Sequence, residues 1–261
     1  MVPQVPVDAS AGNEILRLAS ADNFRDVAGE GYPTADGARA RTGVFFRSND
    51  LRLTDADHRV LGGIGLKAVI DLRSTVETAL HPDPEVPGAE TLHFDAIGIP
   101  MERVALLTSR DDAVAVMEEV YRAFVTHPKS RAAFGAVLTQ LAEGGPQLFH
   151  CAAGKDRTGW VAALLLHLAG VDDPTIESDY LLSNARSAAS RARTEAEIAR
   201  GLGQERVAVF EPVLVADTAY LHAAYAAVEA DYGDRATYLR DGLGLDDALL
   251  ERLRALLREP A

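Results

Sequence analysis

The chain has 261 residues, a formal net charge of −13 and a single cysteine. This length allows one large domain or two small ones, and the shares of hydrophobic (48%) and charged (25%) residues are those of a globular protein. The acidic excess argues against general nucleic-acid binding, which relies on positive charge. One cysteine excludes a disulfide within the chain.

No apolar stretch has the length of a membrane-spanning helix, so stable membrane insertion is not expected. The longest stretch, VAALLLHLAG at residues 161–170, contains His167 and is interpreted as a buried helix. Residues 1–14 lack the basic and apolar regions of a secretory signal, and residues 1–13 are predicted to form a flexible tail. These features favour a cytoplasmic location, with export without a visible signal left open.

Strand-like and helix-like segments alternate along the chain, which predicts an α/β fold with a central, mostly parallel sheet flanked by helices. Ser74 and Glu77 have the spacing of a capping box at the start of one helix. No Pro/Gly/Ser-rich linker divides the chain, so residues 14–261 are interpreted as a single domain with helical insertions at about 100–143 and 183–215. The predicted strands are residues 43–48, 66–73, 89–98 and 146–151, and the predicted helices are residues 53–65, 74–80, 111–143 with a break at Pro128, 157–169, and the chain from Asp173 onward.

The cysteine lies in HCAAGKDRTG, residues 150–159, between the last predicted strand and the helix that follows it. A loop that enters a helix presents successive backbone N–H groups and forms an anion cradle. A thiolate at Cys151 would be stabilised by those groups, and a thiolate attacks phosphorus more readily than a thiol does. Six positions later, Arg157 offers a planar fork for two phosphate oxygens.

The neighbours of Cys151 support this chemistry over the alternative that it is a small buried hydrophobe. We expect Gly154 to allow a turn that side chains resist and Gly159 to let the helix pack closely on the sheet. We also expect Thr158 to hydrogen-bond the sulfur and His150 to brace the loop through its ring nitrogens. The chain contains no standard metal signature, so no metal or cofactor is expected.

The loop resembles the signature loop of cysteine-dependent tyrosine phosphatases, in the bacterial form His-Cys-x-x-Gly-Lys-Asp-Arg-Thr-Gly. The resemblance extends over roughly residues 20–257 and includes NFRDVAGEGYPTADGARARTGVFFRSNDLRLTDAD, VIDLRSTVE, DYLLSN and YGDRATYLRDGLGLDDALLERLRALL. It implies a tyrosine phosphatase-like fold and a metal-independent, two-step hydrolysis through a cysteinyl-phosphate at Cys151. It also implies a set of phosphate-binding residues in the loop, namely Ala152, Ala153, Gly154, Lys155, Arg157 and Thr158.

The resemblance does not fix the general acid. Larger tyrosine phosphatases use an aspartate in a mobile Trp-Pro-Asp loop, which this chain lacks, and its one tryptophan is Trp160. Three aspartates at the ends of predicted strands or in the loop remain candidates: Asp156, Asp95 and Asp71. We favour Asp156, because some similar lipid phosphatases with an Asp-Arg-Thr loop are thought to use that residue. Asp71 is a better candidate for holding Arg73 or Arg47 in place.

Other residues leave further alternatives open. Arg47 and Ser48 end a predicted strand and either orient the loop or substrate or form a surface salt bridge. Lys155 either indicates substrates richer in negative charge, such as phosphoinositides, or is a solvated loop residue. One of the helical insertions is predicted to act as a lid over the pocket, as in relatives, and ordinary core or surface helices are the alternative.

The sequence therefore predicts a phosphatase that acts on phosphotyrosine, with phosphoserine, phosphothreonine and phosphoinositides as further candidate substrates. The expected partner is a phosphorylated protein or phosphoinositide substrate, and no oligomeric state is predicted. Three alternatives remain: a phosphoinositide phosphatase, a silent phosphate-binding module and a sulfur-transfer enzyme of the rhodanese kind. The intact Cys151 and Arg157 argue against the second, and the residues after Gly154 argue against the third.

Overall fold

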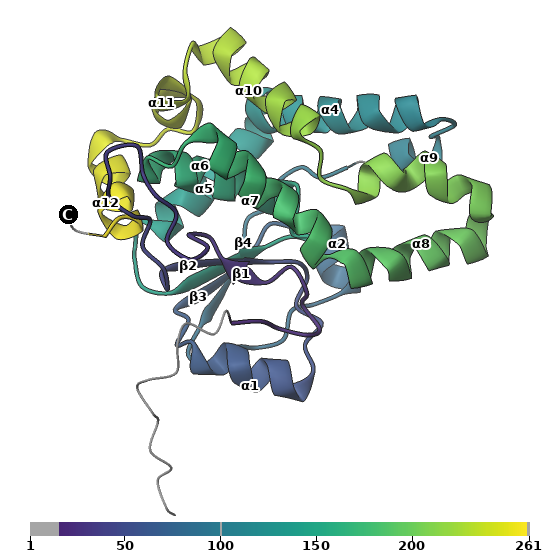
Figure 1. The fold of residues 1–261 in the computed structure, drawn as a ribbon, viewed down its shortest axis with the longest axis horizontal. Helices are drawn as coiled ribbons and strands as arrows, with labels where there is room; N and C mark the ends of the chain where they lie inside the picture. Colours follow the sequence, from purple (N-terminus) through teal and green to yellow (C-terminus); the bar gives the residue numbers. More distant parts are fainter. Residues whose placement is uncertain (1–15, 100, 260–261) are drawn as a thin grey trace, which may run out of the picture.

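The computed structural model of the protein describes residues 16–99 and 101–259 (Figure 1). The predicted flexible tail, residues 1–13, lies outside the described residues. A five-stranded sheet runs through the molecule in the order β1-β2-β5-β3-β4. Its strands are β1 (Arg25–Asp26), β2 (Phe45–Ser48), β3 (Ala68–Asp71), β4 (Glu90–His93) and β5 (Gln147–His150).

Neighbouring strands of the sheet run parallel, except that β1 pairs antiparallel with β2. The predicted α/β fold with a mostly parallel sheet is therefore confirmed. The register places His150, the last residue of β5, between Ser48 of β2 and Asp71 of β3. Three strands thus end side by side at the edge of the sheet where the cysteine loop begins.

Most helices lie close to the predicted ranges. Thr54 caps α1, the side chains and backbones of Ser74 and Glu77 form the predicted capping box of α2, and Pro128 is the first residue of α5. The described helices are α1 (Asp55–Gly63), α2 (Thr75–Leu80), α3 (Met101–Ala105), α4 (Arg110–Thr126), α5 (Pro128–Leu141), α6 (Arg157–Ala169), α7 (Asp173–Arg186), α8 (Ala188–Leu202), α9 (Gln204–Leu214), α10 (Thr218–Tyr232), α11 (Arg235–Thr237), the π-helix η1 (Tyr238–Gly242) and α12 (Asp247–Leu257).

Both faces of the sheet are covered, as expected for parallel strands. Because side chains alternate along a strand, Phe45, Ile70 and Phe149 belong to the large core that includes α6. The adjacent residues Phe46, Val69 and Leu148 belong to a second core, which includes Leu61 of α1 on the opposite face. Figure 1 shows α1 apart from the other helices, with the sheet between it and α6.

Two sequence predictions about strands need correction. The third predicted strand, residues 89–98, is ordered as a strand only over Glu90–His93, so Asp95 lies beyond its end and not at it. Strand β1 was not predicted, because two residues are too few to show a strand pattern.

Within the described part of the chain, no single helix is long and apolar enough to cross a membrane. Helices α9 and α10 reach the length and apolar composition of a membrane span only when they are taken together, and they are bent by 42° relative to each other.

The contact between α5 and the segment after η1 leaves no room for a side chain at Gly135. A Cβ there would lie 2.4 Å from the carbonyl oxygen of Leu243. We expect Gly135→Ala to lower the free energy of unfolding by about 1–3 kcal/mol, measured by urea denaturation, because the backbone must shift. Gly63 in α1 has open space around it, so Gly63→Ala should cost no stability. Equal effects of the two substitutions would contradict the packing described.

Candidate active site

The cysteine loop joins the end of β5 to the start of α6. Cys151 directly follows β5 and Arg157 is the first residue of α6, as predicted. Cys151 is buried with 1% of its surface exposed, whereas Ala152 and Ala153 are exposed. The loop therefore reaches the surface immediately beyond the sulfur.

Three successive carbonyl groups of the loop are held by other parts of the chain. The carbonyl of Ala152 accepts from the Asp50 N–H at 3.0 Å, and that of Ala153 accepts from the Asn23 side-chain amide at 3.1 Å. The carbonyl of Gly154 accepts from Nη2 of Arg47 at 2.9 Å. Because the C=O and the following N–H of a planar trans peptide point in opposite directions, the N–H groups of residues 153–155 face the other side of the loop. This is the arrangement that an anion cradle requires.

Gly154 is required at its position for two reasons. Its φ is +68°, a conformation that residues with a Cβ rarely adopt. A Cβ would also lie 2.4 Å from the carbonyl oxygen of Ser48 and 2.6 Å from the backbone nitrogen of Asn49. The predicted turn is confirmed, and the loop packs directly on the chain that leaves β2.

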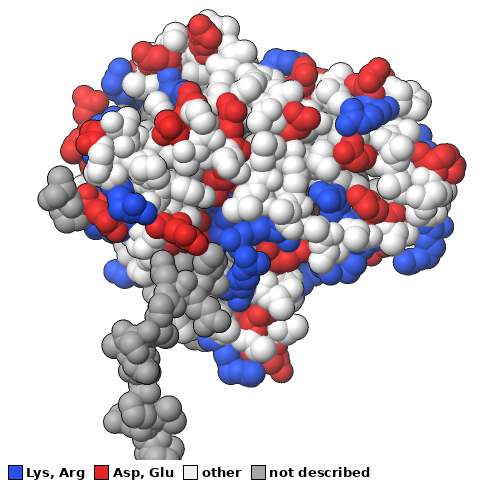
Figure 2. Space-filling model, in the orientation of Figure 1, with Lys and Arg blue, Asp and Glu red and all other residues white. Residues whose placement is uncertain are grey.

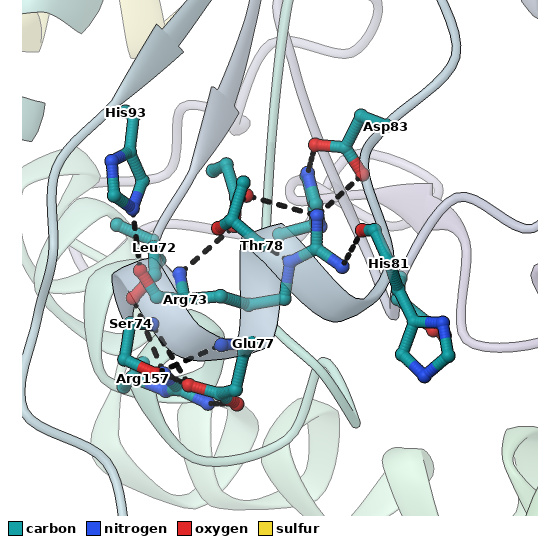
Figure 3. A network of polar contacts seen from close by, with 12 residues as sticks. Leu72, Arg73, Ser74, Glu77, Thr78, His81, Asp83, His93 and Arg157 are labelled. Carbon is teal, nitrogen blue, oxygen red and sulfur yellow. Dashed lines mark hydrogen bonds and ion pairs between the residues drawn. The ribbon is translucent and has the colours of Figure 1, made fainter.

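Glu77 of α2 orients Arg157. The two carboxylate oxygens of Glu77 accept from Nη1 and Nη2 of Arg157 at 2.9 and 2.8 Å, and the carbonyl of Leu72 accepts from Nη1 at 3.3 Å. Burial alone would raise the pKa of Glu77, but the hydrogen bond and charge of Arg157 hold it at about 2. Glu77 also accepts from the Ser74 N–H, so one carboxylate caps α2 and holds Arg157 (Figure 3).

The three bonds from Arg157 leave one edge of its guanidinium for a ligand. A guanidinium has five N–H donors, and the Nε–H and the second Nη2–H are not used by Glu77 or Leu72. These two donors lie on adjacent nitrogens, which is the fork that binds two phosphate oxygens. A Cβ at Gly98 would lie 3.0 Å from Cζ of Arg157, so the chain after β4 passes close against the guanidinium.

Arg47 orients the loop and is not part of a surface salt bridge. Its side chain is 1% exposed and bonds Asp179 of α7 at 2.9 Å, in addition to Gly154. Asp179 also pairs with Arg25 of β1 at 3.1 Å. Burial would raise the pKa of Asp179, but the charges of the two arginines hold it below its ordinary value. Helix α7 is thereby connected to the cysteine loop through Arg47.

Asp71 and His150 belong to a network around Arg73 beside the loop, and Figure 3 shows Arg73 with its partner Asp83. Both oxygens of Asp71 accept from Arg73 at 2.9 Å, as expected if Asp71 holds that arginine. Burial would raise the pKa of Asp71, but Arg73 holds it at about 2. Asp83 bridges Arg73 at 2.7 Å and Nε2 of His150 at 2.8 Å. Ligand atoms of Asp71, Asp83 and His150 lie within 4.8 Å of one another, but Arg73 already supplies their positive charge, so they fit an ion-pair network better than a metal site.

Lys155 and Asp156 form a buried pair within the loop. Nζ of Lys155 lies 2.8 Å from both carboxylate oxygens of Asp156, and the lysine side chain is only 6% exposed. Lys155 is therefore not a solvated loop residue. Asp156 Oδ1 also accepts from the hydroxyl of Tyr121 in α4 at 2.9 Å. Asp95, the remaining candidate acid, pairs instead with Lys129 at 2.8 Å.

Two further expectations for the loop are refined. Gly159 makes room for Tyr180 of α7, whose ring would lie 3.1 Å from a Cβ there, in addition to bringing α6 close to Arg47 of β2. Oγ1 of Thr158 is buried and has no hydrogen-bond partner among the described residues, so the predicted bond to the sulfur of Cys151 is not made.

Comparison with known proteins agrees with this geometry. A model of the tyrosine phosphatase family matches residues 16–259. The chain belongs to the tyrosine phosphatase family. It is 35% identical to the triple specificity protein phosphatase PtpB of Mycobacterium tuberculosis over 93% of this chain and 99% of that protein.

Two further relatives belong with this family. A Cupriavidus necator protein, whose name marks it as a candidate tyrosine-protein phosphatase, is 36% identical over 96% of this chain and 92% of its own length. A tyrosine-protein phosphatase of Nostoc commune is 34% identical over 68% of this chain and 65% of its own length.

Sequence reasoning missed several residues that shape this phosphatase-family loop. Glu77 was predicted only as a capping residue, and no role was predicted for Asn23, Tyr121 or Asp179. Asn23 and Asp179 lie in segments that carried the family resemblance, NFRD and DYLLSN, and this was the one available signal for them. No sequence pattern pointed to Tyr121.

The bond between Glu77 and Arg157 leads to a testable expectation. We expect Glu77→Gln to lower kcat/KM by about 10- to 100-fold, because Gln keeps the capping box but cannot hold the guanidinium with two charged bonds. The assay is hydrolysis of an aryl phosphate at neutral pH. Glu90→Gln, on the exposed part of β4, is the matched control and should leave kcat/KM unchanged.

The same pair should contribute to stability at acidic pH. Because the pKa of Glu77 is about 2 in the folded protein, the pair stabilises the fold fully above the unfolded value of about 4.3 and loses this effect as the pH falls toward 2. Glu77→Gln should remove that part of the acid-induced loss of stability. Unchanged kcat/KM in Glu77→Gln would show that Arg157 does not depend on Glu77.

Proposed function

We propose that this member of the tyrosine phosphatase family hydrolyses phosphotyrosine in proteins through a cysteinyl-phosphate on Cys151. The proposal rests on one combined observation. The loop carbonyls are bonded on the outer side of the loop, and the Nε and Nη2 edge of the Arg157 guanidinium remains available for a ligand. The cradle and the fork both suit a phosphate, whose equatorial oxygens bear the charge in a loose transition state.

In the first step, the sulfur of Cys151 attacks phosphorus while the bond from phosphorus to the phenol oxygen breaks and the acid supplies a proton to that oxygen. In the second step, water attacks phosphorus, the sulfur leaves as thiolate, and the same carboxylate accepts a proton from the water. The loop amides and Arg157 bind the phosphoryl oxygens in both steps. No step requires a metal ion.

We propose Asp156 as the general acid. Asp71 is held as a carboxylate by Arg73, with a pKa of about 2, and is a poor proton donor at neutral pH. Asp95 lies beyond β4 and pairs with an exposed lysine. Asp156 also pairs with a lysine, but it is part of the loop that carries Cys151 and Arg157, and this position supports its assignment.

The substrate range and setting are also proposals. The name of the M. tuberculosis relative supports a range wider than phosphotyrosine, so we include phosphoserine and phosphothreonine, with phosphoinositides as the alternative. Lys155 bonds Asp156, so a second phosphate on the substrate would have to compete with Asp156 for Lys155. Figure 2 shows Lys and Arg gathered near the centre of the face drawn, so an acidic chain still offers basic surface to anionic substrates.

We further propose that residues 14–261 form one phosphatase domain, that it works in the cytoplasm, and that the insertion at 183–215 serves as a lid. The match of the family model to residues 16–259 supports the first point. For the lid, every residue of α8 is described and none is buried, and α8 and α9 form an arm beside α4 in Figure 1. Such a weakly packed segment is suited to movement.

The activity can be tested on a phosphotyrosine peptide, a phosphoserine peptide and a phosphoinositide panel, each with chelator present. We expect turnover of the phosphotyrosine peptide without metal and none with Cys151→Ser. Turnover of phosphoinositides alone would replace the proposal by its lipid alternative. No turnover of any phosphate monoester by the wild type would rule out an enzyme of this kind and favour a silent phosphate-binding module.

The acid can be tested separately with aryl phosphates of different leaving groups. Phenyl phosphate needs protonation of its leaving oxygen, and p-nitrophenyl phosphate needs it much less. We expect Asp156→Asn to lower kcat/KM about 100-fold for phenyl phosphate and far less for p-nitrophenyl phosphate. Asp95→Asn is the matched comparison, and the same selective loss in that variant, with none in Asp156→Asn, would move the acid to Asp95.

A further inference from the structure

Asp156 occupies the N-cap position of α6, yet its side chain does not cap the helix. An aspartate at this position ordinarily accepts a hydrogen bond from a backbone N–H of the first turn. Here the side chain makes no such bond. It is instead directed to Lys155 and to the hydroxyl of Tyr121. The stability of a helix cap has been given up for a side-chain contact.

Tyr121 reaches Asp156 from α4 and is fully buried, with no exposed surface. Its hydroxyl lies 2.9 Å from Asp156 Oδ1 and 2.7 Å from the hydroxyl of Tyr180 in α7, which is also buried. Burial raises the pKa of both tyrosines well above 10, so both hydroxyls carry their protons at neutral pH.

The direction of this chain of hydroxyls is fixed at Asp156. A carboxylate only accepts, so Tyr121 donates its single proton to Asp156, and Tyr180 must donate to Tyr121. The chain therefore runs from the Tyr180 hydroxyl through the Tyr121 hydroxyl to Asp156.

We propose that Tyr121 is a positioning residue for the general acid Asp156, and that Tyr180 orients its hydroxyl. Tyr121 bonds Oδ1 and Lys155 bonds both oxygens, so we assign Oδ2, the oxygen without a hydroxyl partner, to carry the proton to the leaving group. When the proton has moved to that oxygen, Tyr121 and Lys155 stabilise the carboxylate that is left, which then accepts a proton from the attacking water.

This inference rests on the proposed role of Asp156 and assigns a function to Tyr180, the second residue of DYLLSN (residues 179–184), which the mechanism otherwise leaves unused. The first two residues of this segment support the loop at separate points. Asp179 acts through Arg47 on Gly154, and Tyr180 acts through Tyr121 on Asp156. Helix α7 thus holds the phosphate cradle and the acid together.

The test compares Tyr121→Phe, Tyr180→Phe and Tyr220→Phe with Asp156→Asn on phenyl phosphate and p-nitrophenyl phosphate. We expect Tyr121→Phe to lower kcat/KM for phenyl phosphate about tenfold more than for p-nitrophenyl phosphate, because only the poor leaving group needs the acid. Tyr180→Phe should act in the same direction with a smaller ratio. A purely structural role would lower both activities equally.

Tyr220→Phe is the matched control. Tyr220 packs against Tyr121 with ring centres 5.9 Å apart, but its hydroxyl bonds the carbonyl of Pro212 and not Asp156. It should show no difference between the two substrates, and circular dichroism and thermal unfolding confirm that each variant is folded. Equal losses on both substrates in Tyr121→Phe, or no loss, with a selective loss in Asp156→Asn, would overturn the role of Tyr121 alone. No selective loss in Asp156→Asn would overturn the acid and the role of Tyr121 together, while turnover by the wild type but not by Cys151→Ser would leave the phosphatase activity standing.

Discussion

The orientation of the peptide units between Cys151 and Arg157 is the constraint on which the rest of the site depends. A peptide cannot direct its carbonyl and its following N–H to the same side, so holding the carbonyls outward is enough to direct the amides inward. Three parts of the chain provide the outward bonds: Asn23 lies before β1, Arg47 lies in β2, and Asp50 follows β2. Gly154 makes the turn possible by its positive φ and its missing side chain. The cradle is therefore built by the fold before any phosphate is present.

The buried charges around the loop follow from the same requirement. Arg47, Arg157 and Arg73 lie where positive charge would be costly to desolvate, and each is paired with at least one carboxylate. These pairs satisfy the arginines without using all their donors. Arg157 is the important case, because Glu77 bonds the edge that a phosphate does not need. A chain with a net charge of −13 can thus keep a focused positive site.

The sequence predicted the parts of the site that depend on local pattern. Strand β5, the loop and α6 follow one another directly, so their types and boundaries could be predicted from apolar runs and glycines. The contacts of Tyr121 with Asp156 and of Glu77 with Arg157 could not be predicted, since the partners are 35 and 80 positions apart in the sequence. Their roles arise from which helices pack over the loop, and periodicity within one helix carries no such information. Asp156 was proposed as acid from the loop motif, but its unused capping position is visible only in the structure.

In this arrangement, the proposed acid Asp156 takes the place of the aspartate of the Trp-Pro-Asp segment, which this chain lacks. An acid on a mobile loop must be ordered each time substrate binds, and that ordering costs conformational entropy. The proposed acid Asp156, within the cysteine loop, is placed once, during folding, by residues that are already buried. This placement instead lowers the stability of the fold, because a helix cap is lost and two tyrosine hydroxyls are buried in the core. Those hydroxyls remain satisfied only while α4 and α7 keep their places beside the loop, and α10 packs against both helices. Under the proposed assignment of Asp156, proton transfer at the loop depends on the packing of helices far from it in sequence.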